Sequence, residues 1–344
     1  SINIPDSVTR IGRLAFADCA SLARITIPDG VTKISDYTFF RCYALTSITV
    51  PGSVTEIGNY AFTYCHVLTG FTIPDSVTKI GNEAFQGCSG LTYTTYDNAK
   101  YLGNTQNPYL VLMKANGTSI TSCAIHPDTE FIDGSAFYHC SALTGITIPD
   151  GVVSIGDSAF RGCSSLANIT IPGSVVSIGD YAFYECPGLV YTTYDNAEYL
   201  GNAQNPYLVL VKASDTNMET CTIHPDTKII YFAAFIICNR LTGITIPRNV
   251  ISIGNRAFIC GSYFGSLVVE EGNKVYHSSG NCIIETASKT LVVGCKNSVI
   301  PSDGSVTKIG RYAFPYCGFK DLIIPEGVTE IDDRAFDSAS LRSI

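Results

Sequence analysis

Apolar residues recur in this chain every 23 residues. The repeated unit is L-x-x-I-x-I-P-x-x-V-x-x-I-G-x-x-A-F-x-x-C-x-x. Successive copies align without gaps at Leu22, Leu45, Leu68 and Leu91, and again at Cys19, Cys42, Cys65 and Cys88. One such unit cannot bury its own apolar face, so the units must stack on one another as the turns of a solenoid.

Each segment of the unit predicts a different local structure. The alternation I-x-I is typical of a short strand with one buried face, and the proline after it ends the strand because proline cannot donate to a sheet ladder. The V-x-x-I segment predicts a second apolar turn. The glycine that follows, such as Gly58 or Gly81, suggests a backbone with positive φ. A-F-x-x-C predicts a short helical turn that points phenylalanine and cysteine inward.

Three units depart from the regular period, near residues 91–120, 189–218 and 264–295. The insert Y-D-N-A-x-Y-L-G-N-x-x-N-P-Y-L begins at Tyr96 and returns 98 residues later at Tyr194, so a block of units was duplicated. We interpret each insert as a β-hairpin that replaces the turn, with Gly-Asn and Asn-Pro in the loop. The third irregular unit predicts a hairpin across residues 282–284 and 291–293.

The predicted architecture is one domain, residues 1–344, with a curved parallel sheet on the concave side. Short turns, helical turns and the hairpin inserts form the convex side, and there is one strand per rung. Counting strand starts, the last two at Phe319 and Leu341, gives about fifteen rungs. At ~4.8 Å per strand the sheet is roughly 70 Å long. Both ends fall inside a repeat, so we expect a fragment of a longer array.

The 14 cysteines follow the repeat and do not form a disulfide pattern. A disulfide framework would not place one cysteine per rung at constant pitch, so we expect reduced, buried thiols. Only Cys282 and Cys295, which flank a hairpin, are candidates for a bridge, and the sequence leaves that open. Ten cysteines share one repeat position: Cys19, Cys42, Cys65, Cys88, Cys140, Cys163, Cys186, Cys238, Cys260 and Cys317.

Charge, hydropathy and missing motifs argue against several classes of function. The net charge of −8 argues against nucleic-acid binding, and the longest apolar run is too short for membrane insertion. The chain has no C-x-x-C, H-E-x-x-H, G-x-S-x-G or phosphate-binding loop, and no pair of acidic residues stands out. We therefore expect no catalytic residue, no metal and no cofactor. The chain is expected to be a non-enzymatic monomer.

The segment I-P-D-S-V-T-K-I-G-N-E-A-F-Q-G-C, residues 73–88, resembles the BspA-like, or Treponema pallidum-type, leucine-rich repeats of bacterial surface proteins. The resemblance covers essentially the whole chain. It implies a leucine-rich-repeat solenoid at the cell surface or outside a bacterial cell, adhesion, and a protein ligand. It supplies no catalytic residues. The chain departs from the repeat where the glycine is replaced, at Ser35, Asp133, Tyr231 and Asp332.

The inserts carry the candidate binding residues. His126 aligns with Pro149 of a regular unit, and Asp97 occupies the same column one rung earlier. Neighbouring strands lie ~4.8 Å apart, so each Asp is predicted to hydrogen-bond its His. The pair is explained either by turn chemistry or by a binding site that occurs twice. The complete set is Tyr93, Asp97, Tyr101, Tyr109 and His126, with Tyr191, Asp195, Tyr199, Tyr207 and His224 in the second copy.

Three functions remain open. The first is a scaffold that binds a protein or a glycan through the inserts, which are expected to project from the solenoid with exposed tyrosines. The second is a spacer that displays another domain. The third is an accessory domain of an enzyme whose catalytic part lies elsewhere. Binding predicts varied, aromatic-rich residues on one face, whereas a spacer predicts uniform columns such as the threonines Thr26, Thr49, Thr72, Thr95, Thr147 and Thr170.

Overall fold

The computed structural model describes residues 2–261, 263–314 and 322–339. Cys317, Phe319 and Leu341 of the predicted repeat columns lie outside them. The chain forms two compact units, residues 1–175 with 181–189 and residues 176–180 with 190–344. Both are built from the same repeat.

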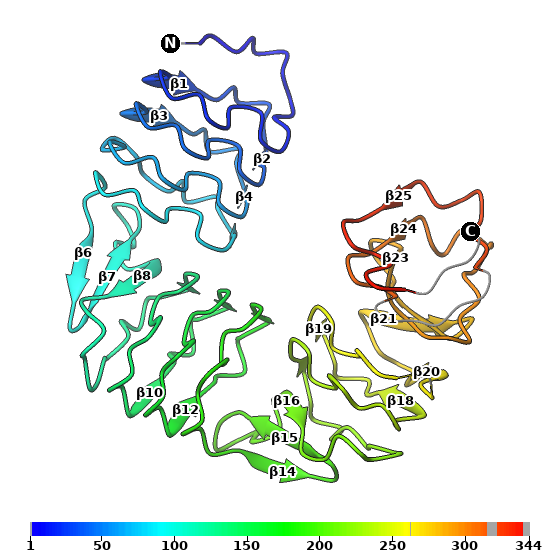
Figure 1. Ribbon diagram of the computed structural model, residues 1–344. Helices are drawn as coiled ribbons and strands as arrows, with labels where there is room; N and C mark the ends of the chain where they lie inside the picture. The colour runs from blue at the N-terminus through cyan, green and yellow to red at the C-terminus, as the bar shows by residue number, and fades with distance from the viewer. Residues whose placement is uncertain (1, 262, 315–321, 340–344) are drawn as a thin grey trace. The chain divides into compact units, whose positions relative to one another are not determined.

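Each regular rung of the first unit contributes to two columns of short strands (Figure 1). The I-x-I column contains β1 (Arg24–Thr26), β3 (Ser47–Thr49), β6 (Thr94–Tyr96), β10 (Gly145–Thr147) and β12 (Asn168–Thr170). The second column contains β2 (Lys33–Ile34), β4 (Glu56–Ile57), β5 (Lys79–Ile80), β8 (Val111–Ala115), β9 (Phe131–Ile132) and β11 (Ser154–Ile155). The insert adds β7 (Ala99–Leu102).

The second unit repeats this arrangement. Its I-x-I strands are β14 (Thr192–Tyr194), β18 (Gly243–Ile246) and β20 (Ser266–Val269). Its second column contains β13 (Ser177–Ile178), β16 (Val209–Ala213), β17 (Ile229–Ile230), β19 (Ser252–Ile253), β23 (Thr290–Gly294), β24 (Lys308–Ile309) and β25 (Glu330–Ile331). The inserts add β15 (Ala197–Leu200), β21 (Tyr276–Ser279) and β22 (Cys282–Glu285).

Rungs pair in parallel and in the register that the repeat predicts. Ile25 lies opposite Ile48 in the first column, and Ile34, Ile57 and Ile80 follow one another in the second. The solenoid and its parallel pairing are therefore confirmed. The expectation of one strand per rung is wrong, because the V-x-x-I segment ends in a second strand. The described residues contain thirteen strands of this second column, close to the predicted rung number.

The A-F-x-x-C segment is a series of tight turns, and the described residues contain no helix. Consequently no helix in this part of the chain is long and apolar enough to cross a membrane. The residue before each described Ala-Phe pair and the residue before most cysteines of the repeat column have left-handed backbones, as at Tyr60 (φ 55°) and Tyr64 (φ 63°). An α-helix has no left-handed positions, so the prediction of a helical turn is wrong.

The repeated glycine is required by close contact between rungs. A Cβ atom on Gly81 would lie 2.4 Å from the backbone nitrogen of Asn59, and one on Gly58 would lie 2.6 Å from that of Asp36. Neither glycine has a positive φ, so the sequence-based explanation is wrong. At this point the backbones of successive rungs approach too closely for any side chain.

Phenylalanine and cysteine form the inner wall of the turns. Phe39, Phe62 and Phe85 stack ring on ring, with centroids 5.3 and 5.4 Å apart. The Cys65 thiol donates a hydrogen bond to the Phe39 carbonyl of the preceding rung at 3.2 Å, and Cys88 repeats this contact with Phe62 at 3.0 Å. Sulfur is small enough for the core and can still donate this hydrogen bond.

All thirteen cysteines within the described residues are free, including Cys282 and Cys295, for which the sequence left a bridge open. Eight of the nine described cysteines of the repeat column are buried, and Cys19 is partly exposed. Burial raises the pKa of the Cys42 and Cys163 thiols to about 12. The prediction of free, buried thiols is confirmed for these eight, and the raised pKa keeps the Cys42 and Cys163 thiols protonated at neutral pH.

The irregular rungs contain the predicted hairpins. β7 pairs antiparallel with both β6 and β8, and β8 then pairs in parallel with β9. The insert therefore links the I-x-I column to the second column within one sheet. β15 does the same between β14 and β16, and β22 pairs antiparallel with β21 and β23.

An irregular rung has no A-F-x-x-C turn, so the turns before and after it meet. In the first unit the Asp157 amide donates to the Asn82 side chain at 2.7 Å, across the insert. The Glu83 amide donates to a carboxyl oxygen of Asp133 at 3.0 Å, and the Ser135 hydroxyl donates to the Glu83 carboxylate at 2.8 Å. Asp133 replaces the repeat glycine here because its side chain fills the space that the missing turn leaves.

The close contact at Gly81 predicts the cost of a methyl group there. Gly81→Ala should lower the free energy of unfolding by about 1–3 kcal/mol, the usual cost of overpacking, because the backbones of two rungs must separate. Urea denaturation will measure this cost. Gly12→Ala is the matched control, since a Cβ at that repeat position meets no atom within 4 Å. Equal effects of the two substitutions would contradict the contact.

The buried Asp133 predicts a pH dependence of stability. Burial raises the pKa of its carboxyl to about 8, from an ordinary value near 3.8. The folded state therefore binds the extra proton between these values, and the stabilisation is lost as pH rises toward 8. We expect stability to fall by up to about 1.4 kcal/mol per pH unit between pH 5 and 8 relative to Asp133→Asn. Denaturation at several pH values tests this, with exposed Asp150→Asn as the control. Parallel profiles for wild type and Asp133→Asn would refute it.

Candidate functional site

Each insert gathers three tyrosines and one histidine. The first aromatic cluster consists of Tyr96, Tyr101, Tyr109 and His126, which come from β6, β7, the hairpin loop and the next rung. The second aromatic cluster consists of Tyr194, Tyr199, Tyr207 and His224 in the second unit. Both arise because the hairpin returns to the second strand column and brings its loop against the following rung.

The loop that carries Tyr109 is held by asparagine side chains. The side-chain oxygen Oδ1 of Asn104 accepts hydrogen bonds from the backbone amides of Gln106 and Asn107 at 2.9 and 2.7 Å. The Asn107 side chain accepts the Tyr109 amide at 3.0 Å and donates to the Asp128 carbonyl of the next rung at 2.8 Å. These Asx contacts fix the loop without a regular element. The second insert repeats all four bonds.

The ring geometry is nearly the same in the two clusters. Tyr109 stacks on His126 with centroids 3.6 Å apart, and Tyr207 stacks on His224 at 3.8 Å. Tyr96 meets the His126 ring edge-on at 4.8 Å, and Tyr194 meets His224 at 4.7 Å. The T-shaped contacts of Tyr96 and Tyr194 are the arrangement that aromatic quadrupoles favour, whereas Tyr109 and Tyr207 lie face to face with the imidazole.

Histidine orientation is set by the turn that follows it. The Asp128 amide lies 3.2 Å from Nδ1 of His126, so this nitrogen accepts the hydrogen bond, and the neutral ring carries its proton on Nε2. The same contact between Asp226 and His224 also measures 3.2 Å. Each ring is therefore held on one side by its own turn and on its face by tyrosine.

Tyr101 is the buried support of the first cluster. Its side chain is 0 % exposed, and its hydroxyl accepts the His126 amide at 3.3 Å. Burial raises the pKa of this hydroxyl, and the same holds for Tyr199 in the second cluster. The expectation that the inserts project from the solenoid with exposed tyrosines is wrong for these two. The hairpins are part of the core.

The predicted Asp–His pairs do not form. Asp97 has a left-handed backbone (φ 45°) in the tight turn between β6 and β7. That turn directs its carboxylate to the Ala124 amide at 2.6 Å, and Asp195 contacts Thr222 in the same way. The carboxylate closest to His126 is that of Asp128, 3.8 Å from Nδ1. The alignment placed Asp97 in the right rung but did not include the reversal of the chain at this residue.

Tyr93 and Tyr191 also lie apart from the clusters. The Tyr93 hydroxyl donates to the Cys88 carbonyl at 3.0 Å, and the Lys114 ammonium lies over its ring. Lys212 covers Tyr191 in the second copy, 4.6 Å from the ring centre. Of the ten predicted residues, six therefore come together in the clusters: Tyr101, Tyr109, His126, Tyr199, Tyr207 and His224.

Tyr96 and Tyr194 join the clusters, although sequence reasoning did not select them. Tyr96 occupies the strand position that regular rungs fill with buried isoleucine, as at Ile148. It remains 38 % exposed, whereas Ile148 is buried. The sequence did contain a signal for these two residues: both irregular rungs have an aromatic residue at a strand position that regular rungs fill with isoleucine.

The clusters offer ring faces, ring edges and hydroxyl groups. No group of three or more His, Cys, Asp or Glu side chains suited to a metal ion occurs among the residues that the structure describes. A partly exposed tyrosine on a packed aromatic base can contact an apolar surface or a sugar ring and also hydrogen-bond through its hydroxyl.

Comparison with solved structures finds bacterial leucine-rich-repeat proteins. A leucine-rich cell surface protein from Faecalibacterium prausnitzii is 28% identical, with 94% of this chain and 87% of that chain covered and a TM-score of 0.33. The Treponema pallidum leucine-rich-repeat protein is 25% identical, with 55% and 77% covered and a TM-score of 0.31. A Bacteroides ovatus leucine-rich-repeat protein is 21% identical, with 98% and 84% covered and a TM-score of 0.31. Comparison with curated sequences gives no match.

A model of one protein family matches most of the chain. The model of the BspA-type leucine-rich-repeat region matches in six copies over residues 1–106, 115–203, 213–279 and 291–344, which is most of the chain. These matches include the repeats from which the two strand columns are built. The chain therefore belongs to the BspA-type leucine-rich-repeat family.

Proposed function

We propose that this protein is a non-catalytic binding scaffold at the bacterial cell surface, and that it recognises a protein or glycan partner through the two aromatic clusters. The observation that carries the proposal is the repetition of the cluster. The same arrangement of four rings occurs in both inserts, with matching contacts. Regular rungs fill the strand position of Tyr96 and Tyr194 with aliphatic residues, so packing alone does not require an aromatic ring there.

Burial and support favour recognition over simple packing. Tyr101 and Tyr199 fill the core, so the more exposed Tyr96 and Tyr194 are held on a rigid base. Tyrosines held in this way make good interface anchors, since little side-chain freedom is lost on binding. Apolar area and a hydroxyl group on the same residue suit both protein and sugar partners.

A cell-surface location is supported by the family and by the similar Faecalibacterium prausnitzii protein, which is a leucine-rich cell surface protein. A repeat array with parallel strands also presents an extended surface to partners. We propose that the chain acts there as a monomer and without a cofactor.

A spacer function is favoured by a different observation. The middle positions of the I-x-I strands are exposed threonines in most regular rungs, including Thr26, Thr49 and Thr147. A uniform exposed column offers little variety for recognition. Both functions can occur in one chain, and a binding measurement separates them.

The binding proposal predicts the effect of removing the exposed rings. The double substitution Tyr96→Ala and Tyr194→Ala should weaken binding at least about tenfold, since an anchor tyrosine contributes 2 kcal/mol or more (roughly) to an interface. Labelled protein would be measured on arrays of bacterial and host glycans and of cell-surface proteins. Circular dichroism would confirm that the fold is retained.

The matched control is the double substitution Tyr138→Ala and Tyr184→Ala. These tyrosines are 40% and 51% exposed and lie outside the clusters. They should have no effect on binding. Equal affinities of wild type and the Tyr96/Tyr194 variant for every retained partner would remove the clusters from recognition and favour the spacer.

A further inference from the structure

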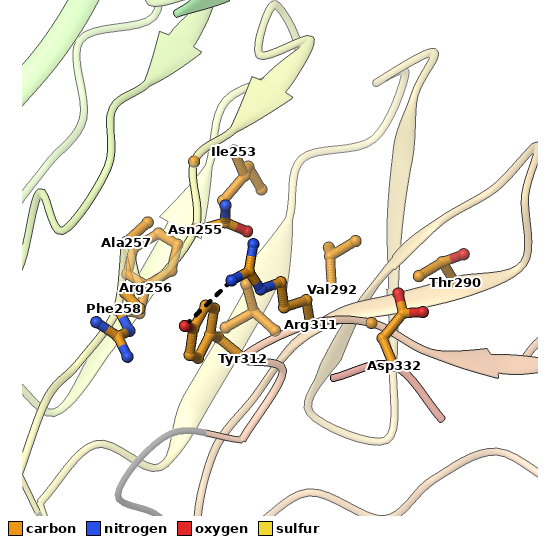
Figure 2. Close-up of a pocket in the computed structure, with 13 residues that line it drawn as sticks. Ile253, Asn255, Arg256, Ala257, Phe258, Thr290, Val292, Arg311, Tyr312 and Asp332 are labelled. Carbon is orange, nitrogen blue, oxygen red and sulfur yellow. Dashed lines mark hydrogen bonds between the residues drawn. The ribbon is translucent and has the colours of Figure 1, made fainter. Parts of the chain in front are cut away.

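The third irregular rung encloses a cavity that the first does not. In the first unit, the space between the turns on either side of the insert is reduced to about 10 Å³, which is at the limit for one water molecule. At the corresponding place in the second unit, a cavity of about 230 Å³ lies between residues 253–258 and residues 310–312 (Figure 2). β23 forms its floor.

Two smaller side chains open this space. Leu112 pairs with Ile132 in the first unit and Leu291 pairs with Ile309 in the second, which fixes the correspondence. Gly310 thus takes the place of Asp133, whose carboxylate fills the first space. Val292 takes the place of the buried Met113.

A charged side chain enters the opened space. Arg311 takes the place of Gly134, where a Cβ would lie 2.8 Å from the Glu83 side chain, so the first unit has no room for it. In Figure 2 the Arg311 side chain extends from the later turn toward Asn255 of the earlier one. Its contact with the Tyr312 hydroxyl is long, at 3.5 Å.

The neighbouring carboxylates already have partners. Asp332 pairs with Lys308 at 2.9 Å, Asp337 pairs with Arg256 at 3.0 Å, and Asp180 accepts a hydrogen bond from Asn255 at 3.1 Å. The ion pairs of the described residues within 4 Å do not include Arg311. Its charge acts on Asp180, because burial raises the pKa of the Asp180 carboxyl and the charges of Arg311 and Arg256 oppose that shift. The guanidinium of Arg311 keeps hydrogen-bond donors for a negatively charged ligand in the cavity.

The rest of the lining completes a small site. The Ser288 hydroxyl gives its single proton to the Glu285 carboxylate, so the Thr290 hydroxyl donates to Ser288 at 2.8 Å and offers only its lone pairs to the cavity. Ile253, Val292 and Val293 supply an apolar wall. Apolar walls with a few placed polar groups are typical of small-molecule sites.

We propose that this cavity binds a small carboxylate, with the Arg311 guanidinium on the carboxylate group and the body of the ligand against Val292 and Ile253. A planar guanidinium matches a carboxylate in charge and in hydrogen-bond geometry. The ligand is an acidic sugar or an acidic amino-acid residue. This site is separate from the aromatic clusters and does not depend on their function.

Isothermal titration of the full chain tests the proposal with D-glucuronate and N-acetyl-L-glutamate. D-glucose and N-acetyl-L-glutamine are the uncharged counterparts. We expect one acid to bind at a single site in the millimolar range, about 4 kcal/mol of binding free energy, and the uncharged counterparts not to bind. Binding of glucuronate alone identifies an acidic sugar, and binding of N-acetyl-glutamate alone identifies an acidic residue.

Three variants locate the site. Arg311→Gln should weaken binding about tenfold or more, since a charge-assisted hydrogen bond is lost. Val292→Met restores the residue type of the first unit and should also weaken binding, by filling the cavity without changing charge. Arg240→Gln removes an exposed charge elsewhere in the second unit and should have no effect. Absence of binding by both acids, equal binding of the uncharged counterparts, or full binding by Arg311→Gln would overturn the proposal.

Discussion

The whole array depends on how closely the backbones of successive rungs approach one another after the second strand. At Gly58 and Gly81 no side chain fits between one rung and the next, so the spacing is fixed by main-chain atoms. In the rungs with this contact, phenylalanine rings lie at stacking distance and the thiol reaches the carbonyl of the rung before it. The side-chain columns are consequences of this backbone contact.

The irregular rungs show what happens when the column of turns is interrupted. Cys140 follows an insert that has no phenylalanine, and its thiol contacts the Gly117 carbonyl at 3.6 Å instead. Polar side chains then connect the turns on either side, through Asn82 and Asp133 in the first unit and Arg256 in the second. Each interruption removes a repeated apolar contact and leaves space for residues that differ between units. Both the aromatic clusters and the cavity lie at such interruptions.

The period of the sequence was sufficient to predict the solenoid, the parallel register and the hairpins, because burial of one apolar face sets all three. Features shorter than the period were not predictable in this way. A two-residue strand such as Lys33–Ile34 is too short to show alternation. Left-handed residues such as Tyr60 and Tyr64 have no sequence signature, since most are not glycine. Six of the ten candidate residues lie together in the aromatic clusters, and the Asp–His pairing failed because Asp97 has a positive φ angle that turns its side chain away.

The thiol column has a consequence for how such a chain matures. Every described cysteine is free, and in regular rungs such as those of Cys65 and Cys88 the thiol donates to the phenylalanine carbonyl of the rung before it. Burial raises the pKa of thiols such as Cys42 and Cys163 to about 12, which suppresses exchange reactions there, because these reactions require the thiolate. Among the described residues, assembly of the rungs therefore depends on packing and hydrogen bonds and needs no disulfide to form.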